Sequence, residues 1–113
     1  MNIEDLALWG ADVKDGLARC MNMEAFYLRL VESVKTEKRF EELAAALEAG
    51  EVEAAFGAAH ALKGVLGNLS LTPLYEPMCE LTEALRGKDS LEGVEYQELA
   101  DAIASRLEAF RAL

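Results

Sequence analysis

Apolar side chains recur every three or four residues along most of this chain, which is the spacing of amphipathic helices. The strict alternation of apolar and polar residues that indicates a strand is missing, as are long runs of β-branched or aromatic residues. Residues 1–11 are predicted to form an arm or a short, weak helix that packs on the rest. Helices are predicted over residues 12–20, 23–35, 37–49, 51–69, 72–86 and 94–112.

Residues with known preferences for helix ends support these boundaries. Asp12 and Asn22 are candidate N-caps, because their side-chain oxygens can accept hydrogen bonds from the first free backbone N–H groups of a helix. Thr72 followed by Pro73 is typical of a helix start, with threonine as the N-cap. Gly50 is expected to end the helix that precedes it.

The apolar residues of each predicted helix form one stripe, and these stripes should meet in a common core. Pro77 falls inside the helix over residues 72–86 and is expected to kink it or distort its first turn. The expected core positions are Val13, Leu17 and Cys20; Phe26, Leu30 and Val34, with Tyr27 as a further candidate; Phe40, Leu43, Ala44 and Leu47; Val52, Ala55, Phe56, Ala59, Leu62, Leu66 and Leu69; and Leu99, Ala102, Ile103, Leu107 and Phe110.

Helices of this length with short connections favour an all-α fold, and we predict an antiparallel four-helix bundle with a short N-terminal helix covering one end. The chain has 113 residues, which suffices for one core, so residues 1–113 are expected to form a single domain. Cys20 and Cys79 belong to no CxxC pair. We expect them to be reduced, mostly buried thiols in a cytoplasmic protein.

The charge balance limits the possible partners. The chain has 11 Lys and Arg against 21 Asp and Glu, which gives a formal net charge of −10 at pH 7. Phosphate backbones and anionic membrane surfaces would repel such a protein, so nucleic acid and membranes are not expected as partners. The acidity is more consistent with protein partners.

The stretch from Gly57 to Gly67 contains the only histidine of the chain, His60. At about 100° of rotation per residue, His60 lies roughly 120° from the middle of the apolar stripe of its helix, so we predict an exposed side chain. Gly57, Gly64 and Gly67 fall near the same line, and Ala61 lies beside it. Each glycine inside a helix costs about 0.8–1 kcal/mol relative to alanine, so three of them indicate close approach of another surface.

Lys63 lies three residues after His60, where its ammonium group could neutralise an anion attached to the imidazole. A di-metal bundle site would need Glu-x-x-His, but position 57 is glycine, and one histidine cannot form a ligand set. No motif supports a hydrolytic triad or an ATP site. Apart from an incidental surface histidine, covalent catalysis remains, because neutral imidazole is a competent nucleophile toward an activated phosphoryl group.

One segment resembles the signature of histidine-containing phosphotransfer (HPt) domains of two-component phosphorelays. It reads Ala59-His60-Ala61-Leu62-Lys63-Gly64-Val65-Leu66-Gly67-Asn68-Leu69. Residues 15–19 and 27–30 are similar to the N-terminal part of the family, residues 47–51 to the lead-in of the histidine helix, and residues 81–86 to the stretch after it. The resemblance therefore covers about residues 12–88.

The resemblance implies that His60 is the phosphoacceptor, that Lys63 counters the phosphoryl charge and that Gly64 leaves room for a partner. Leu66 and Ser70 depart from the family pattern, which usually has a small residue and a glycine at these positions. Leu66 falls on the core side, so we expect altered packing there, and Ser70 is expected to alter the end of the helix.

The implied function is that of a phosphorelay intermediate, which takes a phosphoryl group from the aspartyl phosphate of one receiver domain and passes it to another. The partners would be response-regulator receiver domains, a hybrid sensor histidine kinase or both, docking over Gly57, Ala61, Gly64 and Gly67. The receiver would supply Mg²⁺, so the chain is expected to need no cofactor or metal of its own, to lack kinase activity and to be a monomer. Two alternatives stay open: a helical adaptor that docks without accepting phosphate, and an excised piece of a larger sensor kinase.

Overall fold

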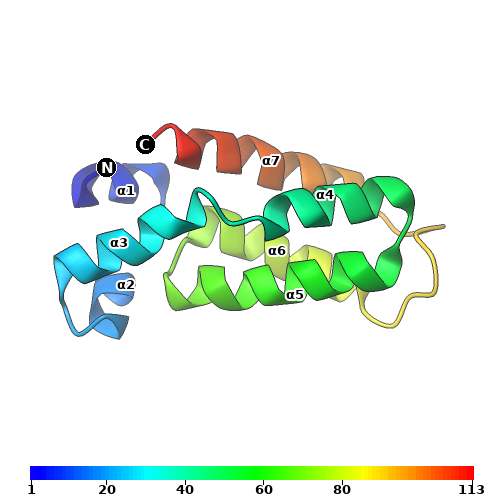
Figure 1. The fold of residues 1–113 in the computed structure, drawn as a ribbon, viewed down its shortest axis with the longest axis horizontal. Helices are drawn as coiled ribbons and strands as arrows, with labels where there is room; N and C mark the ends of the chain where they lie inside the picture. The colour runs from blue at the N-terminus through cyan, green and yellow to red at the C-terminus, as the bar shows by residue number, and fades with distance from the viewer.

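Helices joined by short turns make up most of residues 1–113 in the computed structural model, and there is no strand (Figure 1). The predicted all-α class is therefore confirmed. None of the helices combines the length and the apolar character needed to span a membrane. The helices are α1 (Ile3–Trp9), α2 (Val13–Arg19), α3 (Glu24–Val34), α4 (Arg39–Ala49), α5 (Val52–Asn68), α6 (Thr72–Leu85) and α7 (Gln97–Arg111).

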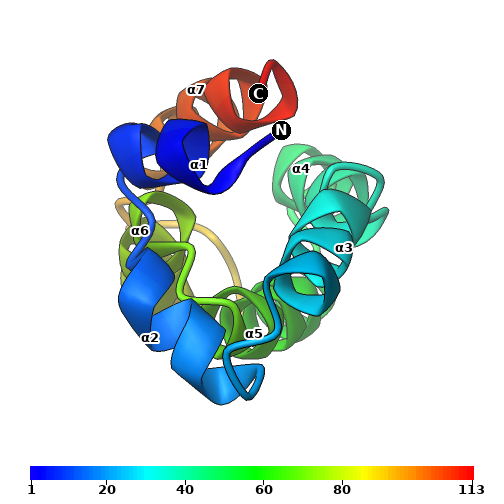
Figure 2. The same cartoon turned by 90° about the vertical axis from the view of Figure 1, so that its left-hand side faces the viewer.

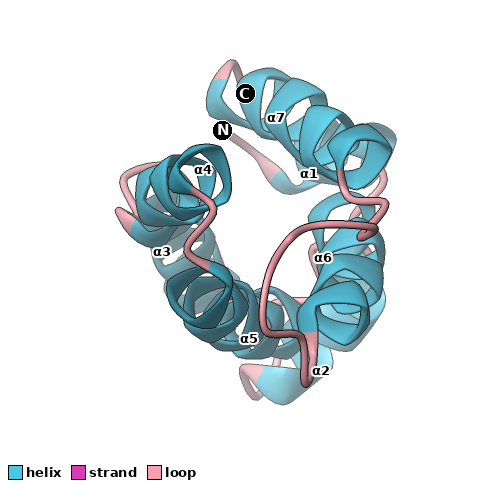
Figure 3. Ribbon diagram, turned by 90° about the vertical axis from the view of Figure 1, so that its right-hand side faces the viewer, coloured by secondary structure: helices cyan, strands magenta, loops and turns pink.

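The predicted four-helix bundle is formed by α4 to α7, which run antiparallel to their neighbours in the chain (Figures 1 and 3). Helix α5 packs between α4 and α6, and α7 packs on α6. Helices α1, α2 and α3 gather at one end of the bundle, where α3 lies end to end with α4 (Figures 1 and 2). The sequence predicts that one short N-terminal helix covers this end of the bundle. In the structure α1, α2 and α3 cover it together (Figure 2).

One buried core connects these elements, and most of the predicted core positions belong to it. The predicted stripe of α3 is partly wrong. Val34 and the further candidate Tyr27 are buried, but Val31 joins them, whereas Phe26 is 41% exposed and Leu30 only partly buried. In α4, Ala46 is buried in place of Ala44. Core residues shared by the four bundle helices include Phe40, Leu43, Leu47, Ala55, Ala59, Leu62, Leu66, Leu74, Met78, Leu81, Leu85, Ile103, Leu107 and Phe110.

Two of the predicted helix ends are confirmed. The Asp12 side chain accepts a hydrogen bond from the backbone N–H of Asp15 at 3.2 Å, which caps α2. Gly50 ends α4 in the left-handed region with φ +73°, a conformation that costs glycine little. Local side-chain chemistry is sufficient to determine both ends.

Two other predicted N-caps are wrong. Asn22 has φ +56° and takes part in the turn between α2 and α3, so Met23 precedes α3 and no side chain caps it. Thr72 lies inside the first turn of α6 behind Leu71, and its hydroxyl donates back to the Ser70 carbonyl at 3.4 Å. In both places the tight connection to the preceding helix decides the backbone conformation.

Helix α6 continues through Pro77 without a break. Proline has no N–H to donate to the carbonyl four residues earlier, which here is that of Pro73. The Arg106 guanidinium of α7 donates to that carbonyl at 2.9 Å, so a neighbouring helix replaces the missing bond. Helix α7 itself begins at Gln97, three residues later than the apolar spacing predicts. The backbone N–H of Val94 donates to the Leu91 carbonyl at 3.0 Å, and residues 94–96 are irregular.

Tyr27 ties α3 to the end of α5. Its phenol is fully buried and donates to the Leu69 carbonyl at 2.8 Å. We expect Tyr27→Phe to lower the free energy of unfolding by about 1–2 kcal/mol, because a buried carbonyl loses its partner. Urea denaturation of the two proteins measures this difference, and equal midpoints would contradict it.

Tyr27 also makes the free energy of unfolding depend on pH in alkaline solution. Burial raises the pKa of Tyr27 from its ordinary value of 10 to about 12. The unfolded chain therefore releases this proton first, and the contribution to stability is present below pH 10 and lost as the pH rises toward about 12. Between these values the stability of Tyr27→Phe should fall less steeply than that of the wild type.

Candidate functional site

Helix α5 has two distinct faces. Its inner face is formed by Val52, Ala55, Ala59, Leu62 and Leu66, all of which are buried. His60 lies on the outer face and is exposed, as the helical phase predicts. The burial of the inner face fixes the rotation of the helix, which in turn fixes the direction in which the imidazole projects.

The glycines of α5 have two different structural roles. A Cβ atom built on Gly57 or on Gly64 would meet no other atom within 4 Å, so nothing in the folded chain requires glycine there. A Cβ atom on Gly67 would lie 2.8 Å from Cε1 of Tyr75 on α6. The aromatic ring already fills the space above Gly67, so packing between α5 and α6 explains that glycine. The bare surface around the histidine is therefore confined to Gly57 and Gly64.

An aromatic ring lies against the histidine. Phe56, one turn before His60, stacks on the imidazole with ring centroids 5.7 Å apart and an angle of 14° between the planes. The guanidinium carbon of Arg86 lies 5.1 Å from the centroid of the same phenyl ring. Arg86 follows the last residue of α6, so side chains from two helices meet at the phenyl ring that stacks on the imidazole.

Glu83 holds Arg86 in this position. The arginine Nε and Nη2 atoms donate to the two carboxylate oxygens at 3.0 and 3.1 Å. These bonds lower the pKa of Glu83, and the positive charge of Lys63 contributes in the same direction. The carboxylate in turn raises the pKa of Arg86. The two side chains therefore form an exposed, doubly hydrogen-bonded ion pair at one side of the site.

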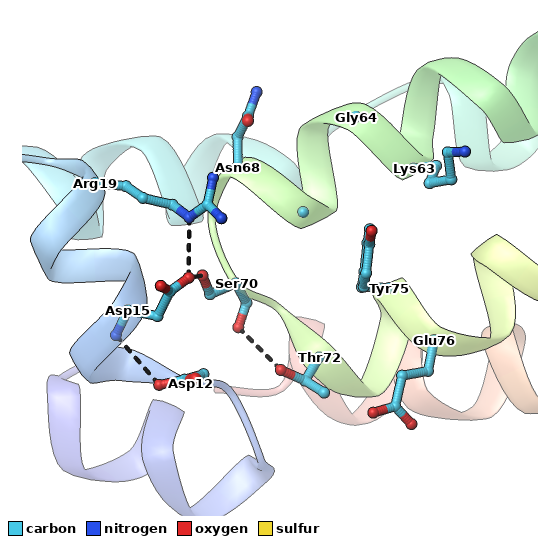
Figure 4. Close-up of a pocket in the computed structure, with 11 residues that line it drawn as sticks. Asp12, Asp15, Arg19, Lys63, Gly64, Asn68, Ser70, Thr72, Tyr75 and Glu76 are labelled. Carbon is cyan, nitrogen blue, oxygen red and sulfur yellow. Dashed lines mark hydrogen bonds and ion pairs between the residues drawn. The ribbon is translucent and has the colours of Figure 1, made fainter.

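Lys63 lies on the other side, where it is partly buried and lines a polar hollow of about 490 Å³ between α2, α5 and α6. Lys63 and Gly64 lie toward one end of this hollow and Arg19 of α2 toward the other (Figure 4).

The C-terminus of α5 is anchored to α2. Ser70 adopts a left-handed conformation with φ +56°, which glycine would adopt more easily. Its hydroxyl donates to the Asp15 carboxylate, and its carbonyl accepts from the backbone N–H of Asp12 at 3.0 Å. The hydrogen bonds from Ser70 and then from Arg19 lower the pKa of Asp15. The departure from glycine at position 70 thus supplies a hydroxyl that links two helices.

Three residues beside the histidine are absent from the site that the sequence predicts. The apolar spacing places Phe56 in the core, and Glu83 and Arg86 lie in a stretch whose only signal is its resemblance to the family. The one sequence signal for the contact is the spacing of four between Phe56 and His60, which places the rings on neighbouring turns. No group of three or more His, Cys, Asp or Glu side chains is arranged to hold a metal ion.

Comparison with known families identifies this arrangement. The family model described as Hpt domain matches residues 33–113, which is more than half of the chain and includes the whole of α5. The similar stretches at residues 15–19 and 27–30 lie outside the match. Neither the curated proteins nor the solved structures gave a match. By this match the chain belongs to the Hpt-domain family, the histidine-containing phosphotransfer domains of two-component phosphorelays.

Proposed function

We propose that this domain is a phosphorelay intermediate and that His60 is its phosphoacceptor. The observation that carries the proposal is the position of the only histidine, which is exposed between two glycines that no part of the fold requires. A nucleophile that lies on an outer helix face beside unfilled space can be reached by a group bound to another protein.

The transfer requires no pocket on this chain. The unprotonated ring nitrogen of His60 attacks the phosphorus of an aspartyl phosphate on a receiver domain. A nitrogen–phosphorus bond forms, the bond from phosphorus to the acyl oxygen breaks, and the aspartate carboxylate leaves with the electron pair. Attack by the carboxylate of a second receiver reverses these steps and returns a free imidazole.

The receiver is expected to provide Mg²⁺ and most of the charge stabilisation, since phosphoryl transfer depends on positioning and electrostatics. On this chain Gly57, Ala61 and Gly64 would form the docking surface around the histidine. Gly67 also belongs to the surface predicted from the sequence, but Tyr75 covers it, so we leave it out of the proposed contact. A receiver domain and a receiver-bearing sensor kinase would use the same face, and the chain would act as a monomer.

Lys63 is proposed to stabilise the phosphoryl group during transfer. It is partly buried and lies three residues after His60 on α5, a spacing that places the two side chains on neighbouring parts of the helix surface. We expect Lys63→Ala to slow transfer from a phosphorylated receiver by about tenfold, because one charge-assisted interaction in the transition state is lost.

Single-turnover assays at saturating receiver measure this rate, and Lys63→Arg serves as the matched control that keeps the charge. Thermal unfolding should show that all three proteins are folded. An unchanged rate in Lys63→Ala would remove the lysine from the mechanism, although His60 would keep its role.

The function itself is tested by incubating the protein with a panel of phosphorylated receiver domains and following phosphate that is labile in acid and stable in base. The proposal predicts such phosphate on the wild-type chain with at least one receiver. Binding to receivers without any labelling would instead indicate an adaptor, and the proposal would be wrong.

A further inference from the structure

We propose that Phe56 is a positioning residue, which sets the direction of the His60 imidazole for phosphoryl transfer, and that Arg86 and Glu83 hold Phe56 in place. This inference rests on the proposed function of His60. It assigns a role to three residues that the signature around the histidine does not include.

The imidazole needs such a support because it makes no hydrogen bond within the chain. An exposed ring without hydrogen bonds is free to rotate about its side-chain torsions. In-line attack on a bound phosphoryl group requires the reacting nitrogen to point along one direction, and small misplacements slow such reactions strongly. Only packing can restrict the ring here.

Phe56 supplies this packing. The near-parallel planes, 14° apart, and the centroid distance of 5.7 Å describe an offset stack, which is a favoured arrangement of aromatic rings. The phenyl ring is partly buried and packs against the core, so it is more restricted than the imidazole. The exposed imidazole is therefore restricted by contact with a phenyl ring that the bundle holds in place.

Arg86 restricts the phenyl ring from α6. Its guanidinium lies over the ring at 5.1 Å, within the range of a cation–π contact. Arginine is flexible when it is exposed, but two hydrogen bonds to Glu83 fix the guanidinium plane. The pair also leaves little net charge beside the histidine, so its role is steric and orienting. Lys63 remains the charge that faces the phosphoryl group.

The single histidine allows a direct test by NMR, because only one set of imidazole signals exists. The phenyl ring current should shift the carbon-bound imidazole protons of the wild type away from their free-imidazole positions. In Phe56→Leu these signals should move toward the free-imidazole positions, and in Phe56→Tyr they should stay close to the wild type. Signals that do not move in Phe56→Leu would overturn the proposed stack.

Kinetics separate positioning from docking. Phe56→Leu should bind the receiver with unchanged affinity, while its single-turnover rate at saturating receiver falls by about tenfold. Phe56→Tyr should restore the rate. A loss confined to receiver affinity would make Phe56 a docking contact, and a wild-type rate in Phe56→Leu would leave it no role in transfer; either result overturns the proposal.

Arg86→Gln provides a second variant that does not alter the core. We expect its imidazole signals and its transfer rate to lie between those of the wild type and Phe56→Leu, and values equal to the wild type would remove Arg86 from the proposal. The NMR measurement requires no phosphate. It can therefore confirm or reject the stack even if the wild type accepts no phosphoryl group, a result that would reject the proposed function instead.

Discussion

Gly64→Ala should make the domain more stable and at the same time impair its function. The substitution removes a glycine from the interior of α5, and the new methyl group meets no atom within 4 Å. Helix propensity alone then predicts a gain of about 1 kcal/mol in the free energy of unfolding. In the proposed complex the same methyl group enters the space that the receiver must occupy, so we expect transfer to slow by about tenfold or more.

Thermal unfolding and single-turnover transfer, measured on the same samples, provide the two values. Ser105→Ala is the matched control, because it raises the helix propensity at an exposed position of α7, far from α5 in the sequence. It should gain stability without any change in transfer. A Gly64→Ala protein that is stabilised and transfers at the wild-type rate would show that Gly64 is not a docking position.

Gly16→Ala should have the opposite effect on the fold. A Cβ atom at this buried position of α2 would lie 2.5 Å from the Tyr27 hydroxyl and 2.6 Å from two carbons of its ring. The ring cannot move away easily, because its hydroxyl is bonded to the Leu69 carbonyl. We expect a loss of about 2–3 kcal/mol, since overpacking outweighs the propensity gain that alanine normally brings to a helix.

Chemical denaturation measures this loss, and Gly57→Ala is its control. Gly57 lies in a helix too, but a Cβ atom added there would have no other atom within 4 Å, so that variant should gain about 1 kcal/mol. A Gly16→Ala protein as stable as the wild type would mean that α2 can shift away from α3 at little cost. The close contact would then not anchor α2.

The sequence predicts which glycines lie near His60, but it does not show which of them another helix covers. Gly57, Gly64 and Gly67 all fall near one line on the surface of the predicted helix, and the sequence predicts one shared reason for all three. The structure separates Gly67, because Tyr75 of α6 covers it. Which glycine faces a neighbouring ring depends on how two helices are brought together, and the spacing within one helix carries no information about that.

The exposure of His60 was predictable, because it depends only on the periodicity of α5, and the long apolar stripe of that helix leaves one possible rotation. Spacing allowed either Phe26 or Tyr27 as the buried residue in the first turn of α3 and could not decide between them. The rotation of α3 follows the hydrogen bond from Tyr27 to Leu69, a residue 42 positions away in the chain. The N-caps predicted for α3 and α6 were wrong for a related reason, since tight connections to preceding helices override the local preferences of Asn22 and Thr72.

The contacts around His60 could not be predicted from sequence spacing either. Phe56 lies one turn from His60 in the sequence, but its stacking became visible only in three dimensions. Arg86 and Glu83 reach the site because α6 runs antiparallel to α5 and returns its last turn to the level of Phe56 (Figure 1). Residues contributed by a second helix can be recognised only after the pairing of the helices is known.

The most direct measurement is to locate the phosphate after transfer from a phosphorylated receiver domain, using the wild type and His60→Gln. We expect one phosphoryl group on the wild-type chain, labile in acid, stable in base and mapped by peptide analysis to His60. His60→Gln should remain folded, bind the receiver and carry no such group. Equal labelling of His60→Gln, or mapping of the wild-type label to another residue, would show that His60 is not the phosphoacceptor.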